Sequence, residues 1–192
     1  LLFDPGEAWH YGIGIDWAGR LLEIASGRKL GDWMRDEIFA PLGMRDSAFR
    51  ITPCMRARLA KMHQRDAAGT IAPLPDFEIP QDPEFEMGGG GLYSTAADYA
   101  RFLRMILNRG ELDGVRVLRA ETVAQMSADQ IPGLEVQPLR TQVPALSEDA
   151  EFFPGLSKGW GLSFMINRAD APTGRPAGSL AWAGLSNCYY WI

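Results

Sequence analysis

Tyr11 stands where a phenol could act on a substrate, in the stretch WHYG at residues 9–12, directly ahead of an amphipathic run. A phenol titrates near 10, so a general base that works near neutral pH needs its pKa lowered by roughly 3 units, or about 4 kcal/mol. A helix N-terminus supplies about 0.3–1 kcal/mol of this, and a nearby lysine ammonium must supply most of the rest. The sequence alone does not show such a lysine. The alternative interpretation is an aromatic side chain that packs at the entrance of a helix.

Two glycine-rich stretches do not match nucleotide-binding motifs. In GIGIDWAG, residues 12–19, a dinucleotide fingerprint needs its third glycine where Trp17 stands, and no predicted strand precedes it. The run of four glycines at 88–91 lacks the lysine of a phosphate-binding loop, although Ser94 and Thr95 follow it. We therefore expect the second run to let the backbone pass close to a neighbouring segment or a ligand.

The histidines and serines offer no complete catalytic or metal-binding set. His10 and His63 are the only histidines, and neither stands in an HExxH or Cys/His spacing, so we expect no metal and no cofactor. A Ser-His-Asp triad is poorly supported for the same reason, and GxSxG does not occur. Ser26 and Lys29 match S-x-x-K, but the lysine of that motif must share a helical face with the serine. Because Gly27 is expected to end the helix, we interpret the match as a helix terminus with solvated basic residues.

The elements that position these residues are predicted to be helices in the first part of the chain. Apolar residues recur at helical spacing after Tyr11, and a second helix is predicted over 30–39, ending before Pro41. Residues 64–86 are predicted to be a long loop. The apolar stripe of the first helix consists of Ile13, Ile15, Trp17, Ala18, Leu21, Leu22, Ile24 and Ala25.

A third helix is predicted to follow Thr95, because Asp98 three residues later completes a capping pattern. Gly110 is expected to end it, followed by a tight turn at Asp113-Gly114 and a short helix over 120–126. The predicted buried face of the third helix, which follows Thr95, consists of Phe102, Leu103, Ile106 and Leu107.

The last part of the chain is predicted to form strands. Residues 160–166 and 180–192 are rich in apolar and aromatic residues, and a Pro/Gly-rich turn at 171–178 separates them. Helices followed by strands are typical of the α+β class with a mostly antiparallel sheet.

Composition and charge limit the function classes. The 192 residues suffice for one domain with a sizeable core, and 46% hydrophobic with 22% charged residues is ordinary for a soluble globular protein. A net charge of −5 gives no reason to expect binding to nucleic acid or to an anionic membrane surface. No apolar run approaches the roughly 20 residues that span a bilayer. Cys54 and Cys188 are interpreted as two buried thiols rather than a disulfide, which leaves the compartment open, with the cytoplasm slightly favoured over the periplasm.

Four stretches, in their order and spacing, resemble the serine β-lactamase-like hydrolases, most closely the family VIII carboxylesterases, which are related to class C β-lactamases and D-alanyl-D-alanine peptidases. They are PGEAWHYGIGIDWAGRLLEIASG, IFAPLGMRDSAF, GGGGLYSTAADYARFLRMILNRGELDGVRVLRAETVAQM and WAGLSNCYYWI. The resemblance covers nearly the whole chain and implies a β-lactamase/transpeptidase-like α+β fold, an antiparallel sheet flanked by helices. Residues 1–192 are then expected to be part of one such domain, lacking its N-terminal segment with the S-x-x-K motif and its extreme C-terminus.

The resemblance also implies the site residues. These enzymes use the Ser of S-x-x-K as nucleophile with the Lys assisting, a Tyr of a Y-x-N-like motif as base and then proton donor, and a K-T-G-like triplet on a strand. Tyr11 occupies the tyrosine position, and Trp182, Ala183 and Gly184 occupy the triplet. The backbone N–H of Leu185 is expected to be one oxyanion donor, and the N–H of the nucleophile the other. The nucleophile and its lysine are expected upstream of this sequence.

Two departures from the family pattern indicate the substrate. Ile13 replaces the Asn of Y-x-N and cannot hydrogen-bond a substrate amide, and Trp182 replaces a cationic residue that would bind a carboxylate. Both favour a neutral, partly apolar ester, although Trp182 could instead be an ordinary core aromatic.

The resulting prediction is a serine hydrolase that cleaves small carboxylic esters through an acyl-enzyme. Its expected partners are a small-molecule ester and the remainder of its own polypeptide, and the oligomeric state is open. A β-lactamase or D-alanyl-D-alanine peptidase, and a catalytically inactive binding module on the same scaffold, are the alternatives.

Overall fold

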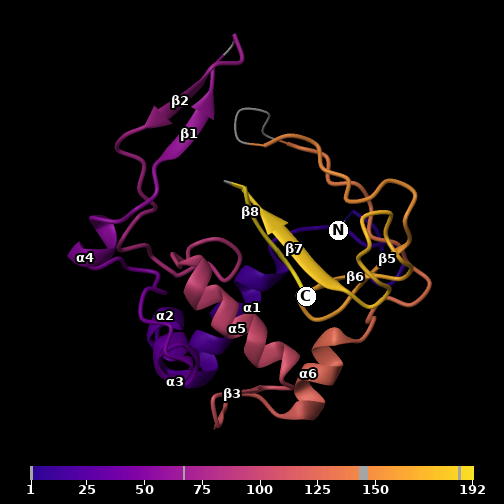
Figure 1. Cartoon of the computed structure of the whole chain (residues 1–192), viewed down its shortest axis with the longest axis horizontal. Coiled ribbons are helices and arrows are strands. Elements are labelled where there is room, and N and C mark those ends of the chain that lie inside the picture. The colour runs from indigo at the N-terminus through magenta and orange to yellow at the C-terminus, as the bar shows by residue number, and fades with distance from the viewer. Residues whose placement is uncertain (1, 67, 143–146, 186) are drawn as a thin grey trace. The chain divides into compact units, whose positions relative to one another are not determined.

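The computed structural model describes residues 2–66, 68–142, 147–185 and 187–192 (Figure 1). They divide into two compact units, one formed by Leu1–Tyr11 with Ala120–Ile192 and the other by Gly12–Arg119. We call the first the sheet unit and the second the helical unit. Tyr11 and the predicted strands therefore belong to the same unit.

The first helix of the helical unit, α1, spans Gly14–Ser26 and ends as predicted at Gly27, whose φ of 69° is left-handed. Within this helix, Gly19 and Glu23 are the buried residues. Four side chains of the apolar stripe predicted from the sequence are exposed. The exposed fraction is 67% for Ile13, 64% for Trp17 and Leu21, and 66% for Ile24. The helical periodicity was therefore right, but these four side chains are largely exposed in the described chain.

The next helical segment is one continuous run made of α2 (Leu30–Met34), the π-helical turn η1 (Arg35–Phe39) and α3 (Ala40–Leu42). The prediction that it ends before Pro41 is wrong. Pro41 stands in α3, just after the π-helical turn and within the run, and Gly43 with a φ of 68° ends the run instead.

Two buried carboxylates hold the beginning of this run. Glu23 Oε1 accepts the N–H of Leu30 at 3.0 Å, and Glu86 Oε2 accepts the N–H of Gly31 at 2.6 Å. Negative charge at a helix N-terminus is favourable, and these bonds satisfy backbone donors that have no partner within the helix.

The segment predicted to be a long loop contains a hairpin. After α4 (Pro53–Arg56), the strands β1 (Met62–Arg65) and β2 (Ile71–Leu74) pair antiparallel. Asp66 Oδ1 accepts the N–H groups of Ala68 at 2.9 Å and Thr70 at 2.8 Å, a local turn that the prediction missed. Residues 75–86 contain neither helix nor strand, as predicted.

Helix α5 (Ala96–Leu107) begins at the predicted cap, where the Thr95 hydroxyl accepts the N–H of Asp98 at 3.1 Å. Ile106 is buried as predicted, but Leu107 is 61% exposed and Met105 is fully buried. The side chain of Asp98 accounts for this rotation, because its Oδ2 accepts the Asp46 N–H at 2.7 Å and the Ser47 hydroxyl at 2.9 Å. A face that carries a carboxylate is thus turned inward.

The glycine run at 88–91 passes against α1, as expected for an architectural segment. A Cβ on Gly88 would lie 2.6 Å from the carbonyl oxygen of Ile15, so a side chain does not fit there. The N–H of Gly89 donates to Asp16 Oδ1 at 3.0 Å. These contacts explain the glycines without a phosphate or nucleotide ligand.

A short hairpin follows α5, with β3 (Glu111–Leu112) paired to β4 (Val115–Arg116). The predicted tight turn is confirmed, because Asp113 and Gly114 have φ values of 50° and 81°.

The sheet unit contains α6 (Ala120–Ser127), close to its predicted bounds, and a four-stranded antiparallel sheet. The strand order is β5 (Lys158–Trp160), β6 (Met165–Asn167), β7 (Leu180–Gly184) and β8 (Cys188–Trp191). β7 and β8 lie side by side at the yellow end of the chain in Figure 1. Each of the two predicted strands is in fact a hairpin, because Ser163 and Asn187, with φ values of 73° and 59°, lie in the turns. The α+β class with antiparallel pairing is confirmed.

The two cysteines depart from their predicted burial. Cys54 lies in α4 and Cys188 begins β8, and both are exposed. Neither forms a disulfide within the described residues, as expected.

Candidate active site

Tyr11 lies against Trp182 within the sheet unit. Their ring centroids are 5.0 Å apart, with the ring planes inclined by 44°. Tyr11 is 42% exposed, so its ring is not enclosed by packed hydrocarbon. The structure therefore brings together two residues that are 171 positions apart, the number being their difference in the sequence numbering.

Trp182 is the centre of a larger group of rings. It also contacts Trp160 edge-on at 4.7 Å and Phe152 at 6.1 Å, and Trp160 contacts Trp9 at 5.2 Å. We call Trp9, Tyr11, Phe152, Trp160 and Trp182 the aromatic cluster. These separations and tilted geometries are the ones that aromatic pairs prefer.

The aromatic cluster rests on a small buried core. Trp9, Phe152, Trp160 and Trp182 are partly buried and pack on Val136, Met165 and Ala181. Sequence analysis did not identify Trp9, Phe152 or Trp160 as site residues. Their types were visible in the sequence, but their meeting depends on contacts between distant segments.

β7 holds the triplet of residues 182–184. On one side, Trp182 pairs with Tyr190, Ala183 with Tyr189 and Gly184 with Cys188. On the other side, the pairing with β6 involves Leu180 and Ala181, so the triplet extends past the end of β6. Trp182 and Ala183 are half-buried and Gly184 is exposed.

Leu185 follows directly after β7. Its side chain is 61% exposed, and its backbone N–H makes no hydrogen bond to any other residue that the structure describes. A donor that is not used internally is what an oxyanion site requires. Its role as an oxyanion donor stays a prediction.

Three other residues considered from the sequence lie in the helical unit. Ile13 is the N-cap residue of α1 and is therefore in a different unit from Tyr11. Ser26 Oγ accepts the N–H of Arg28 at 3.3 Å, and Gly27 ends α1 between Ser26 and Lys29. The S-x-x-K match is thus a helix terminus, as interpreted.

A buried lysine that sequence analysis overlooked supports the aromatic cluster. Lys158 on β5 is 5% exposed, and its Nζ donates to the carbonyl oxygens of Leu156 at 2.6 Å and Phe153 at 3.3 Å. Burial lowers the pKa of the Lys158 ammonium. Because Nζ is bound to these carbonyls, Lys158 fixes the loop that carries Phe152. Within the described chain, the hydrogen bonds of Nζ go to these carbonyls and not to Tyr11.

An ion-pair network holds the other side of β5. The guanidinium of Arg168 donates to Asp129 Oδ2 at 2.9 Å and to Glu135 Oε1 at 2.8 Å. Glu135 also accepts the Ser157 hydroxyl at 2.8 Å and the Lys158 N–H at 3.1 Å.

Both carboxyls of this network titrate below their ordinary range. Partial burial opposes ionisation of Asp129, but the Ile131 N–H and the Arg168 guanidinium outweigh it and lower the pKa of Asp129. The Ser157 hydroxyl is the largest influence on Glu135, and with the Lys158 N–H and Arg168 it lowers the pKa of Glu135 against the opposing effect of burial. The network is therefore ionised at neutral pH.

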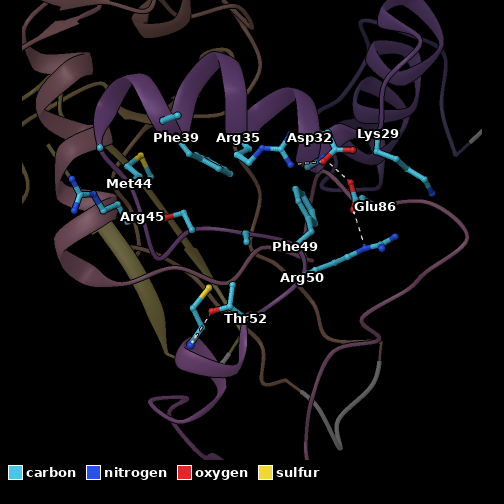
Figure 2. Close-up of a pocket in the computed structure, with 16 residues that line it drawn as sticks. Lys29, Asp32, Arg35, Phe39, Met44, Arg45, Phe49, Arg50, Thr52 and Glu86 are labelled. Atoms are coloured by element: carbon cyan, nitrogen blue, oxygen red, sulfur yellow. Dashed lines mark hydrogen bonds and ion pairs between the residues drawn. The ribbon is translucent and has the colours of Figure 1, made fainter.

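The helical unit contains a cavity of about 640 Å³, shown in Figure 2. Its lining combines apolar side chains such as Phe39 and Phe49 with Arg50 and the buried Glu86, which point toward each other in Figure 2. The hydroxyl of Ser47 in this lining is bonded to Asp98, which also accepts a backbone N–H. Ser47 is therefore part of a hydrogen-bond network in which Asp98 also binds the backbone N–H of Asp46, an arrangement that we interpret as structural.

The described chain contains neither a cluster of potential metal ligands nor a helix of membrane-spanning character. No group of three or more His, Cys, Asp or Glu side chains in it is arranged to hold a metal ion. None of its helices combines the length and the apolar character that crossing a bilayer requires.

Comparison with known proteins assigns the family. The family model described as Beta-lactamase matches residues 1–192. The chain belongs to the β-lactamase family. The predicted resemblance is confirmed, and so is the β-lactamase/transpeptidase-like fold, of which the chain represents a part.

This member of the β-lactamase family is similar to two curated proteins and to a solved structure, among others. Monacolin J acid methylbutanoyltransferase from Aspergillus terreus is 30% identical over 205 residues, covering 98% of this chain and 47% of that protein. Lovastatin esterase from Penicillium rubens is 38% identical over 111 residues, covering 56% of this chain and 28% of that protein. The solved structure of unliganded, selenomethionyl simvastatin synthase (LovD) from Aspergillus terreus matches with a TM-score of 0.79 and 31% identity, covering 98% of this chain and 48% of that one. The chain spans about half the length of these relatives, or less.

Proposed function

We propose that the full-length protein is a serine hydrolase that cleaves small carboxylic esters through an acyl-enzyme, with Tyr11 as general base and then general acid. The observation that carries the proposal is the placement of Tyr11, partly exposed, against Trp182 on β7. Membership of the β-lactamase family and the similarity to a lovastatin esterase support the reaction class.

In the first step, the hydroxyl of a serine outside this sequence attacks the ester carbonyl carbon. Its proton passes to the phenolate oxygen of Tyr11 as the new C–O bond forms. The carbonyl oxygen becomes an oxyanion, which accepts the N–H of Leu185 and the N–H of the serine itself. Tyr11 then donates the proton to the departing alkoxide, and the ester C–O bond breaks. Water repeats the sequence on the acyl-enzyme, releases the acid and restores the serine.

This role requires a cationic group beside the Tyr11 phenol that stabilises its phenolate form. Lys158 is bound to loop carbonyls and does not fill this role. The lysine of the S-x-x-K motif expected upstream of this sequence is the proposed source.

The substrate is a neutral ester. Trp182 offers a ring face where a cationic side chain would bind a carboxylate. An acyl acceptor other than water is a second possibility, because the similar Aspergillus terreus protein is named as a methylbutanoyltransferase. In that case an alcohol takes the place of water in the second step, and the product is a new ester.

The remainder of the polypeptide is the partner that completes the site. The chain spans about half of its relatives, and Ile13, Trp17, Leu21 and Ile24 form an exposed apolar stripe on α1. Because exposed apolar surface of this kind marks an interaction site, we assign the stripe to contacts with the segment that precedes this sequence.

The decisive experiment replaces Tyr11 with phenylalanine in the full-length protein. We expect turnover of p-nitrophenyl acetate to fall by about 10²–10⁴-fold, the usual contribution of a general base, with the fold intact by circular dichroism. Tyr189→Phe, at an exposed tyrosine of the same sheet, is the matched control. Near-normal turnover of Tyr11→Phe would refute the assignment. Opening of a chromogenic cephalosporin at rates that rival ester cleavage would favour a β-lactamase instead.

A further inference from the structure

The aromatic cluster contains more rings than the proposed reaction needs. In the proposed reaction Tyr11 transfers the proton, and its ring lies 5.0 Å from that of Trp182, but Trp160 and Phe152 also contact Trp182 directly. Met165 pairs with both Trp160 and Ala181, so Trp160 lies level with the residue just before Trp182. The edge-on ring contact of 4.7 Å between Trp160 and Trp182 brings a second tryptophan to the same place.

These rings are not simply core residues. Phe152, Trp160 and Trp182 are each only partly buried, in contrast to the Met165 and Ala181 side chains beneath them, which are 2% and 5% exposed. Leaving large apolar rings partly in water is unfavourable. An apolar group of a ligand that covers them gains this free energy.

The cluster also lacks charge of its own. Within the described chain, the cation–π contacts made by Arg175 go to Phe153 and Trp191, outside the cluster. The Lys158 ammonium is bound to the carbonyls of Leu156 and Phe153. A wall of this kind favours an uncharged apolar group over a carboxylate or an ammonium.

We propose that Trp160 and Phe152, together with Trp182, form a specificity wall that binds the non-reacting group of an ester with a bulky apolar substituent, cyclic or aromatic. This inference rests on the proposed function, because it places that substituent beside Tyr11. Trp160 stands at the end of strand β5, and Phe152 lies in a loop. The Lys158 ammonium holds this loop through hydrogen bonds to the carbonyl oxygens of Phe153 and Leu156.

The test compares matched esters on the full-length protein. For the acyl side the pair is p-nitrophenyl acetate and p-nitrophenyl phenylacetate, and for the alcohol side ethyl acetate and benzyl acetate. Trp160→Ala and Phe152→Ala should each lower kcat/KM for the bulky member of one pair by at least about tenfold and for the small member by less than about threefold, as expected for loss of apolar pocket contacts. The pair that responds identifies which side of the ester the wall binds.

Controls separate specificity from folding. Tyr189→Ala removes an exposed ring of β8 outside the cluster and should leave both ratios unchanged. Trp160→Phe, which keeps a ring, should restore most of the preference. Equal loss for small and bulky esters in both alanine variants would mean that the wall only supports the fold, and would overturn the proposal.

A binding measurement distinguishes this proposal from the proposed function. Phenylacetone is a ketone that mimics a bulky ester but cannot be hydrolysed. Calorimetric titration should show weaker binding to Trp160→Ala than to the wild type, by at least about tenfold. If esters are not hydrolysed but this difference holds, the proposed reaction fails while the wall stands. If phenylacetone binds both proteins equally, the wall is refuted whatever the hydrolytic rates.

Discussion

Tyr11, Trp182 and Leu185 contribute different groups to the proposed site. Tyr11 contributes a hydroxyl, Trp182 a ring face, and Leu185 only a backbone N–H, since its side chain is exposed. A backbone donor cannot be removed by changing the side chain to alanine. Substitution by proline removes it, and this difference allows the role of Leu185 to be tested.

We predict that Leu185→Pro lowers kcat/KM for ester cleavage by about 10²–10³-fold, because losing one oxyanion donor costs about 3–4 kcal/mol of transition-state stabilisation. Leu185→Ala keeps the N–H and should retain nearly full activity. Gly184 is already in the extended strand β7, the conformation that a residue before proline adopts, so the fold should tolerate the change. Steady-state kinetics on the full-length protein measure both variants. Equal activity of the proline and alanine variants would remove Leu185 from the oxyanion site.

Among the secondary-structure elements, α1 departs most from an ordinary surface helix. Its buried residues include Glu23, which is held by Arg20 at 2.7 Å and by the Leu30 N–H, while its large apolar side chains are exposed. An amphipathic helix normally buries its apolar stripe. The reversed arrangement is consistent with a second partner for α1 in the complete polypeptide.

We predict that Trp17→Ser destabilises the full-length protein by about 2–4 kcal/mol, near the range for truncating a buried aromatic side chain. The matched control is Ile71→Ser on β2, an apolar residue of the same unit with 58% exposure, which should change stability by no more than about 0.5 kcal/mol. Urea denaturation followed by circular dichroism measures both. A Trp17→Ser variant as stable as the control would show that the stripe stays in water.

At the scale of the whole chain, we expect the free energy of unfolding to depend on two ionised carboxylates, Asp129 and Glu135. Asp129 and Glu135 both have pKa values lowered by their partners, chiefly backbone and hydroxyl donors and Arg168. A carboxyl whose folded pKa lies below its unfolded pKa stabilises the protein above the unfolded value, near 4, and loses that contribution as the pH falls through the folded value. Lower pH therefore weakens the network that holds β5.

We predict that the free energy of unfolding of the full-length protein falls as the pH decreases below about 4, and that Asp129→Asn flattens this dependence while lowering stability at neutral pH. Asp36→Asn is the comparison, because the pKa of Asp36 is also lowered, by Arg35, but the pair is fully at the surface and screened by solvent. Urea denaturation at a series of pH values checks this. An unchanged pH profile in Asp129→Asn would show that the network does not control acid stability.

Local sequence determined much of what was predicted correctly. Gly27 ends α1, Thr95 caps α5, and Asp113-Gly114 forms the turn between β3 and β4. These features could be predicted because each depends on the conformational preference of one or two residues. Four stretches, in their order and spacing, likewise sufficed to predict the family. The errors at Pro41 and in the 64–86 segment arose where short-range turn chemistry was not recognised.

Contacts between distant segments decided the rest. Periodicity locates an apolar stripe on α1 or α5 but not what lies opposite it, so the exposure of Trp17 and the burial of Met105 could not be read from spacing. The contacts of Phe152 and Trp160 with Trp182, and of Trp9 with Trp160, join segments that are far apart in the sequence. Residue types and local conformation are thus determined by the sequence one stretch at a time. Only the tertiary structure decides which side chains are in contact, because packing brings together residues that are far apart in the sequence.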